Sequence, residues 1–209
     1  MHRLILRIIF TLGRIFGRIS KIIPYKFFYP IRILKEGYYT ERLKKYFKQF
    51  GIGNHLSPNM LLINPQHVEI GNRCHFESRV IIETHAIDKK MPFVKIGDDC
   101  SFGEFTHITC CNKIIIGNGL LTGRYVLLTD NSHGNSTKSE TDIMPKNREI
   151  FSKGGIIIGD NVWIGDKVTI LPNVKIGDSC IIGANSVVSN DIPNNVVVAG
   201  IPAKIIKNI

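Results

Sequence analysis

Apolar residues stand at every sixth position through much of this chain, and the pair Ile-Gly recurs where each longer unit begins. Five of the Ile-Gly pairs begin such units, and they start at Ile70, Ile96, Ile116, Ile158 and Ile176. A helix repeats its apolar face about every 3.6 residues and a strand about every 2, so neither explains the spacing. A triangular coil with three short strands per turn does, because each side then takes one six-residue unit. The pattern predicts stacked coils around one continuous apolar core.

The distance between successive pairs of this set of five is 18 residues or more, and the excess over 18 marks insertions. Insertions of 8, 2 and 24 residues each follow the third unit of a coil, so we expect them to leave the coils at the same corner. The longest begins directly after His133. A long polar segment on a rigid scaffold is usually a functional loop. We therefore expect a projecting lid at about residues 134–155, with His133 at its root.

Small or branched residues stand four positions after the apolar ones, where the inside of a triangular coil narrows. They include Cys74, Cys100 and Cys180, which we expect to be buried thiols. The adjacent pair Cys110-Cys111 lacks the spacing of zinc ligands, and nothing suggests disulfides. With no recognisable export signal, this pattern predicts a protein of the reducing cytoplasm.

Composition and charge narrow the choice of partners. The chain has 209 residues, 44% of them hydrophobic, and a formal net charge of +10. These values exclude a disordered chain, and the charge indicates an anionic partner such as nucleic acid, a phosphate-bearing cofactor or a membrane surface. We expect no nucleic-acid binding, because the basic residues of the N-terminus alternate with aliphatic ones and form no groove-reading motif.

The run IGDNVWIGDKVTILPNVKIGDSCIIGANSVV and the closing stretch DIPNNVVVAGIPAKIIKNI carry a family resemblance. They resemble the hexapeptide-repeat acyltransferases, in particular the maltose, galactoside and polysaccharide O-acetyltransferase branch, over roughly residues 60–209. The resemblance implies an all-β solenoid, a left-handed parallel β-helix that assembles as a homotrimer and ends in a short C-terminal helix. We expect this domain at residues 51–209.

His133 is the candidate catalytic residue. A neutral imidazole, with an ordinary pKa of about 6.5, can take the proton of a sugar hydroxyl as that hydroxyl attacks a thioester. In the resembling family a histidine just before the projecting loop is the general base; the alternative is a solvated turn residue. Asp130 is the nearest candidate in sequence for a carboxylate that orients the imidazole. Other candidates are Glu104, Glu140, Asp142 and Glu149.

The donor implied by the resemblance is acetyl-CoA, held in a groove between adjacent subunits. Trp163 would flank the pantetheine arm, and Lys204 and Lys207 would meet the phosphates unless they are merely solvated. The other implied cofactor-binding residues are Gly165, Asp166, Ala184, Ser189 and Asn190. For the acceptor we expect Glu104 and Asn131. Gly103 stands where the family carries a substrate-binding asparagine, which leaves the acceptor contacts open.

We expect no metal site. His75, His107 and His133 end units on three different sides of the coil, so one chain does not bring them together. The alternative is a zinc site between subunits, as in the γ-class carbonic anhydrases, which share the fold implied by the resemblance. Their clustered histidine pattern is not apparent in this sequence.

Residues 1–50 form a different region, predicted as a basic amphipathic helical segment. At 100° per residue, its basic residues fall within about 60° of one another on a helix. They are Arg3, Arg7, Arg14, Arg18 and Lys21. They interrupt the apolar run too often for a membrane span. The segment is either a peripheral membrane contact through residues 1–23 or a cap on the open end of the coils. A second basic helix is expected from Tyr38 to Phe50.

Together these features predict an acetyl-CoA-dependent O-acetyltransferase that acts on a sugar hydroxyl. We expect a role in bacterial surface polysaccharide synthesis, such as O-antigen or capsule, in the cytoplasm or peripherally on the inner membrane, with an acceptor that is a free or lipid-linked saccharide. The alternatives are acetylation of serine or a xenobiotic, and a non-catalytic β-helix scaffold.

Overall fold

The structure is a computed structural model that describes residues 2–19, 29–87, 90–135, 137–140 and 142–209. Two helices, α1 (His2–Ile19) and α2 (Tyr29–Leu43), precede the strands. Short 3₁₀ turns follow at η3 (Lys44–Tyr46), η4 (Pro65–His67), η5 (Lys138–Glu140) and η6 (Pro145–Asn147). No helix among the described residues is long and apolar enough to cross a membrane. Lys21, predicted on the basic face of the first helix, lies outside the described residues.

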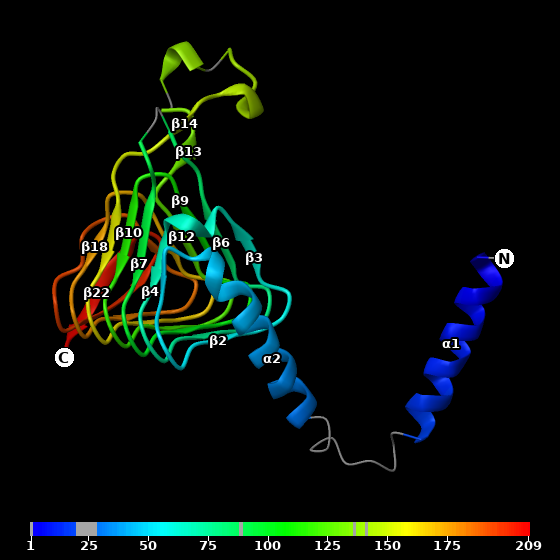
Figure 1. The fold of residues 1–209 in the computed structure, drawn as a ribbon. Coiled ribbons are helices and arrows are strands. Elements are labelled where there is room, and N and C mark those ends of the chain that lie inside the picture. Colours follow the sequence, from blue (N-terminus) through cyan, green and yellow to red (C-terminus); the bar gives the residue numbers. More distant parts are fainter. Residues whose placement is uncertain (1, 20–28, 88–89, 136, 141) are drawn as a thin grey trace.

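Three sheets form the body of the molecule, and each takes one strand from every coil (Figure 1). The first sheet contains β1 (Gln49–Phe50), β4 (Val68–Ile70), β7 (Phe93–Ile96), β10 (Lys113–Ile116), β15 (Ile156–Ile158) and β18 (Lys175–Ile176). The second contains β2 (His55–Leu56), β5 (His75–Phe76), β8 (Ser101–Phe102), β11 (Leu121–Thr122), β16 (Trp163–Ile164), β19 (Ile181–Ile182), β21 (Val196–Gly200) and β22 (Ala203–Asn208). The third contains β3 (Leu61–Ile63), β6 (Ile81–Thr84), β9 (His107–Cys110), β12 (Leu127–Thr129), β17 (Thr169–Ile170) and β20 (Val187–Val188).

Neighbouring strands in these sheets are parallel, with one exception, the antiparallel pair β21–β22. The parallel sheets fit the left-handed β-helix that the family resemblance implies. A fourth, two-stranded sheet pairs β13 (Ser132–His133) with β14 (Ile150–Phe151) and stands outside the triangle.

The core lies inside the triangle and contains the residues of the six-residue repeat. Phe76 and Phe102 stack in successive coils with ring centroids 4.7 Å apart. Cys74, Cys100 and Cys180 are buried and free, in the inward positions expected of them. The free thiols of Cys110 and Cys111 are also buried, and burial raises the pKa of Cys111 to about 12. Burial raises the pKa of Cys110 as well, so both adjacent thiols stay protonated and are poor nucleophiles, which fits a role in packing.

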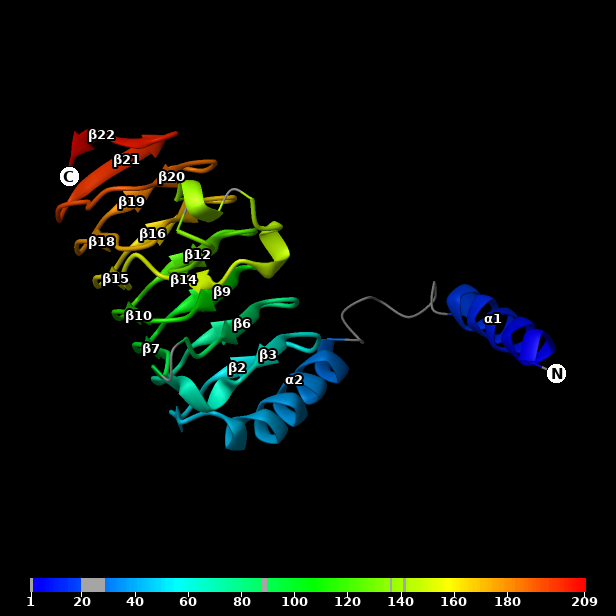
Figure 2. The same cartoon turned by 90° about the horizontal axis from the view of Figure 1, so that it is seen from above.

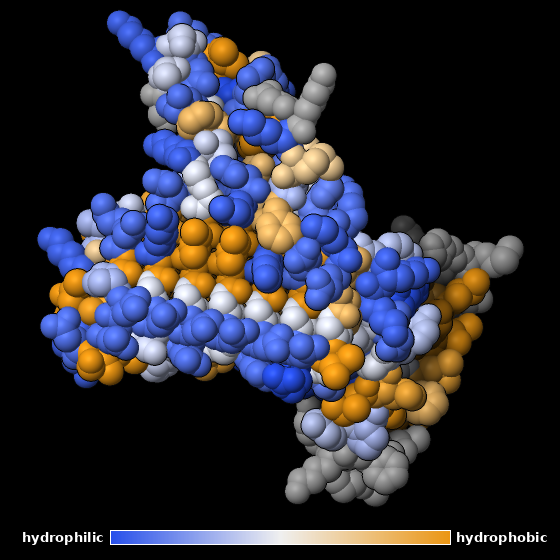
Figure 3. Space-filling model, turned by 60° about the vertical axis from the view of Figure 1, so that its left-hand side comes forward, coloured by the Kyte–Doolittle hydropathy of each residue, from blue (hydrophilic) through white to orange (hydrophobic). Residues whose placement is uncertain are grey.

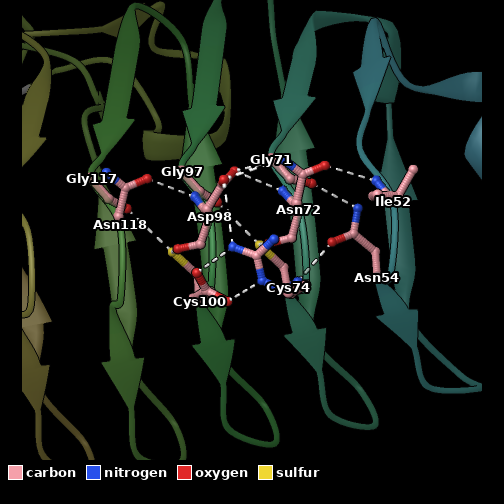
Figure 4. Close-up of polar contacts among 12 residues, drawn as sticks. Ile52, Asn54, Gly71, Asn72, Cys74, Gly97, Asp98, Cys100, Gly117 and Asn118 are labelled. Carbon is pink, nitrogen blue, oxygen red and sulfur yellow. Dashed lines mark hydrogen bonds and ion pairs between the residues drawn. The ribbon is translucent and has the colours of Figure 1, made fainter.

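A ladder of Asn and Asp side chains links successive coils along one corner (Figure 4). Asn72 Oδ1 accepts a hydrogen bond from the backbone N–H of Ile52 at 3.0 Å, and Asp98 Oδ1 accepts one from Asn72 at 2.8 Å. Asn118 Oδ1 continues the series by accepting from the N–H of Asp98 at 2.9 Å. The polar residue after each Ile-Gly pair therefore satisfies a backbone donor that the corner leaves without a strand partner.

The expected second helix over Tyr38–Phe50 is wrong in its bounds. Helix α2 ends at Leu43, and Phe50 belongs to β1, the first strand of a coil that the Ile-Gly pattern missed. Phe50, Leu56 and Leu62 keep the six-residue spacing. This first coil begins with Phe50-Gly51, and its Ile-Gly pair, Ile52-Gly53, is two residues out of register with the others.

The expected short C-terminal helix is also wrong. Residues 203–208 form β22, which runs antiparallel to β21 with Gly200 opposite Ala203 and Val196 opposite Asn208. The stretch contains two adjacent isoleucines, which are strand formers, and β21 offers it an unpaired edge. The added strand therefore covers the C-terminal end of the second sheet. Figure 2 shows it at one end of the stack and α2 at the other.

Candidate active site

The segment after β12 leaves the body as an arm, residues 132–151, at the top of Figure 1. At its root, Ser132 pairs with Phe151 and His133 with Ile150. The N–H of Gly134 donates to the carbonyl of Glu149 at 2.8 Å, which closes the root of the arm. The His133 side chain is exposed. The arm thus holds an accessible imidazole on a short antiparallel ribbon rather than on a free loop.

Asp130 fixes the corner from which the arm departs. Its side chain is fully buried and accepts hydrogen bonds from the consecutive backbone N–H groups of residues 111–113, at 2.7, 2.8 and 2.9 Å. The Cys110 thiol lies 3.3 Å from the same carboxylate. The structure thus gives Asp130 these partners in place of the expected pairing with His133.

Asn131 is tied to the same corner. Its side-chain Nδ2 donates to Thr109 Oγ1 at 3.1 Å, and its backbone carbonyl accepts from Thr129 Oγ1 at 3.0 Å. These contacts orient the residue that was expected to bind the acceptor.

The other carboxylates proposed for His133 lie in the arm or in a neighbouring coil. Glu140 Oε2 accepts from the backbone N–H of Asn135 at 2.7 Å, so this carboxylate folds the arm itself. In the described part of the chain, none of these carboxylates hydrogen-bonds to the His133 ring. Glu140 and Glu149 do line a pocket beneath the arm together with Ile87, Met91 and Phe151.

Trp163 lies in a groove on the second sheet with three of the other residues expected to hold the cofactor. Gly165, Asp166 and Ala184 line it with Trp163, whose side chain is 52% exposed. A Cβ on Gly165 would lie 2.7 Å from the backbone nitrogen of Ala184, so only glycine allows the two coils to approach this closely. The sequence prediction thus names four residues that the fold brings together.

The two C-terminal lysines extend this surface. Trp163 is opposite Ile181, Ile181 opposite Val197, and Val197 opposite Lys207 in one cross-strand row. Directly opposed residues share a face, so Lys207 lies on the face of Trp163, three strand spacings or about 14 Å away. Lys204 is opposite Ala199 on the same strand pair. A tryptophan and two lysines thus share one face.

Ser189 and Asn190 do not join that groove. They follow β20 in the third sheet, at the corner where β12 leads to His133, and Ser189 Oγ lies 2.9 Å from Asn190 Oδ1. Glu104 lies with the groove residues instead, beside Asp166, and pairs with Arg124 at 3.5 Å. Within one chain the predicted residues therefore form two sets, one at the arm and one on the second sheet.

A polar cluster on the outer face of the third sheet was not predicted from the sequence. His107 Nε2 lies 3.0 Å from Glu83 Oε1, and His85 Nε2 lies 3.5 Å from Glu83 Oε2. Burial raises the pKa of Glu83, but the hydrogen bond and charge of His107 outweigh it, so the net pKa is lowered. Equivalent positions in successive coils were the available signal. Among the residues described, no group of three or more His, Cys, Asp or Glu side chains could hold a metal ion.

Comparisons with known proteins agree with this architecture. Residues 155–190 match the family model described as bacterial transferase hexapeptide (six repeats). The chain is 35% identical over 136 residues to a putative lipopolysaccharide biosynthesis O-acetyl transferase, WbbJ, of Escherichia coli K12, covering 64% of this chain and 68% of that protein. This chain belongs to the hexapeptide-repeat acyltransferase family. It is also 43% identical over 96 residues to a galactoside O-acetyltransferase of the same organism, covering 46% of this chain and 44% of that protein.

A solved relative shows the same fold. The hexapeptide-repeat acetyltransferase VCA0836 of Vibrio cholerae O1 biovar eltor, complexed with acetyl coenzyme A, superposes with a TM-score of 0.58 at 23% identity. The match covers 84% of this chain and 78% of that one. The chain therefore belongs to the acyltransferase family by sequence and shares the fold of VCA0836.

Proposed function

We propose that this acyltransferase moves an acetyl group from acetyl-CoA to a saccharide hydroxyl. The observation that carries the proposal is the surface of the second sheet, where the Trp163 groove and Lys207 share one face. An indole beside backbone N–H and C=O groups suits the pantetheine arm, and ammonium groups suit phosphates. VCA0836, with bound acetyl coenzyme A, supports the choice of donor.

His133 would act as the general base. Its imidazole takes the proton of the acceptor hydroxyl as that oxygen attacks the thioester carbonyl carbon. The carbon–sulfur bond then breaks, the acetyl group stays on the saccharide oxygen, and the CoA sulfur leaves as a thiolate that takes up a proton. The exposed ring at the root of the arm supports this role, because both substrates must reach it.

We propose a homotrimer in which the donor groove lies between adjacent chains. Within one chain His133 is at the corner after the third sheet, whereas Trp163 and Lys207 are on the second sheet. A site that needs all three is completed when the arm of one chain reaches the second sheet of the next, and a cyclic trimer repeats this contact three times.

The acceptor proposed is a saccharide of bacterial surface polysaccharide synthesis. The names of the two Escherichia coli relatives, one in lipopolysaccharide biosynthesis and one acting on galactosides, support it. The matched segment spans 68% of the first of these proteins and 44% of the second. The free, buried cysteines support a reducing, cytoplasmic setting.

The test is an assay of acetyl transfer to a panel of free and nucleotide-linked sugars, in which the release of the CoA thiol is measured. We expect His133→Ala to lower kcat by about 100- to 10,000-fold, the usual contribution of a general base. His67→Ala, on η4 away from both residue sets, is the matched control and should keep full activity. Equal turnover by the His133 variant and the wild type would refute the assignment of the base.

A further inference from the structure

Helix α2 turns polar residues toward the coils and apolar residues toward solvent. Its two buried residues are polar: Glu36 is 3% exposed and Thr40 is 8% exposed. Thr40 Oγ1 accepts from the backbone N–H of Leu56 at 2.9 Å, which fastens the helix to the first coil. A surface helix normally turns its apolar stripe toward the core. This helix covers the end of the coils with Glu36 and Thr40, and of its described residues only the last, Leu43, packs an apolar side chain against the core.

The opposite face of α2 is apolar and exposed. Ile31, Leu34 and Tyr38 are 49%, 75% and 63% exposed. At 100° per residue they fall within about 60° of one another, with Lys35 and Arg42 along one border of this stripe and Glu41, which pairs with Lys44, along the other. Figure 3 shows apolar side chains gathered on the helical part of the chain, next to the coils, where hydrophilic and hydrophobic residues form parallel rows. An apolar stripe flanked by cations is the arrangement of helices that lie in a membrane interface.

Helix α1 also combines exposed apolar side chains with cations, and more of its side chains are exposed than in α2. All side chains from residue 5 to residue 18 are exposed, including Ile9 at 59% and Phe16 at 70%. The side chains of Arg7, Arg14 and Arg18 line one side of the helix, with no acidic residue anywhere in it. Since α2 already covers the open end of the coils, α1 is not needed as the cap that the sequence also allowed.

We propose that α1 and the outward face of α2 form a binding surface for a bilayer containing anionic lipids. The apolar side chains enter the boundary between headgroups and acyl chains, and the arginines and lysines meet the lipid phosphates. The cations favour a negatively charged bilayer over a second copy of this chain, whose own helices carry the same charge. No described residue of α1 or α2 lines the Trp163 groove, and Arg32, which lies beside Glu104 and Asp166, is not on the outward face of α2.

The experiment is vesicle sedimentation with the full chain at low salt. The vesicles are phosphatidylcholine alone or phosphatidylcholine with about 30% phosphatidylglycerol. We expect at least a tenfold larger partition coefficient for the anionic vesicles and a marked loss at about 0.5 M NaCl. Equal binding to both vesicle types, or salt-insensitive binding, would overturn the proposal.

Paired variants separate the contributions of the two helices. Arg7→Glu/Arg14→Glu and Ile9→Ser/Phe16→Ser should each reduce partitioning at least tenfold, and Leu34→Ser/Tyr38→Ser should reduce it several-fold. The matched control is Lys175→Glu/Ile209→Ser, which alters an exposed lysine and an exposed isoleucine toward the C-terminal end of the stack, away from α2 (Figure 2). Circular dichroism should show the same fold in all of them.

A second readout distinguishes a bilayer from a protein partner. Light scattering gives the mass of each variant without vesicles. If the α2 variant lost mass while binding vesicles normally, its apolar face would be an interface between copies and the proposal would fail for that helix. Acetyl transfer to a water-soluble saccharide should be unchanged in all these variants, so failure of the membrane proposal is distinguishable from failure of the proposed function.

Discussion

Among single residues, Asp130 ties the start of the arm to the coils. Its carboxylate accepts hydrogen bonds from the three backbone N–H groups of residues 111–113, where β9 leads into β10, and it fixes the corner where the arm begins. We infer that Asp130 positions His133 through the backbone. Sequence order placed the residue near the histidine, but only the coil geometry brings residues 111–113 within reach of its carboxylate.

Asp130→Ala should lower the free energy of unfolding by about 3 kcal/mol, because it leaves the backbone N–H groups of residues 111–113 without an acceptor. Asp142→Asn, in the exposed part of the arm, should change it by less than about 0.5 kcal/mol. Urea denaturation measures both. An Asp130 variant of wild-type stability with strongly reduced kcat and an altered pH profile would contradict this account and favour direct pairing with His133.

Glu83 gives a pH-dependent prediction at the same scale. Its pKa is lowered in the folded chain, so the stabilisation is complete above the ordinary value of 4.5 and is lost as the pH falls through the lowered value. Thermal melts should show wild type more stable than Glu83→Gln at about pH 6, with the difference vanishing at about pH 3. A difference that persists or grows toward low pH would show that the ion pair is not its source.

At the level of elements, the close stacking of corners constrains the repeat. A Cβ on Gly97 would lie 2.6 Å from the carbonyl oxygen of Gly117 in the next coil. Gly97→Ala should therefore destabilise the protein by about 1–3 kcal/mol, the usual effect of overpacking. Gly37→Ala, in α2 with open space around it, should stabilise by about 0.5–1 kcal/mol. Equal unfolding midpoints for both variants would contradict the stacking argument.

The six-residue period predicts most of the coils, because inward positions must be apolar or small whatever the rest of the sequence does. It does not predict β22, since residues 203–208 suit a helix or a strand and pairing with β21 decides between them. The inverted polarity of α2 also depends on its contact with the first coil. In the candidate site, the Trp163 groove follows from the repeat, whereas the partners of Asp130 depend on long-range packing.

On the scale of the whole molecule, two residue sets on different sides of the chain predict a site shared between copies. Equal amounts of His133→Ala and Trp163→Ala chains, unfolded and reassembled together, should regain activity in about one quarter of the sites, because such a site draws each residue from a different chain. Each variant reassembled alone is the control. Mixed assemblies no more active than the controls would place the complete site within one chain.

The most direct test of the central claim is a calorimetric titration of the purified protein with acetyl-CoA. We predict saturable binding with one site per chain, retained by His133→Ala and weakened at least tenfold by Lys204→Glu/Lys207→Glu, since the lysines hold the donor and the histidine acts on the acceptor. No binding up to about 1 mM acetyl-CoA would contradict the assignment of the donor groove and favour a β-helix that serves as a scaffold.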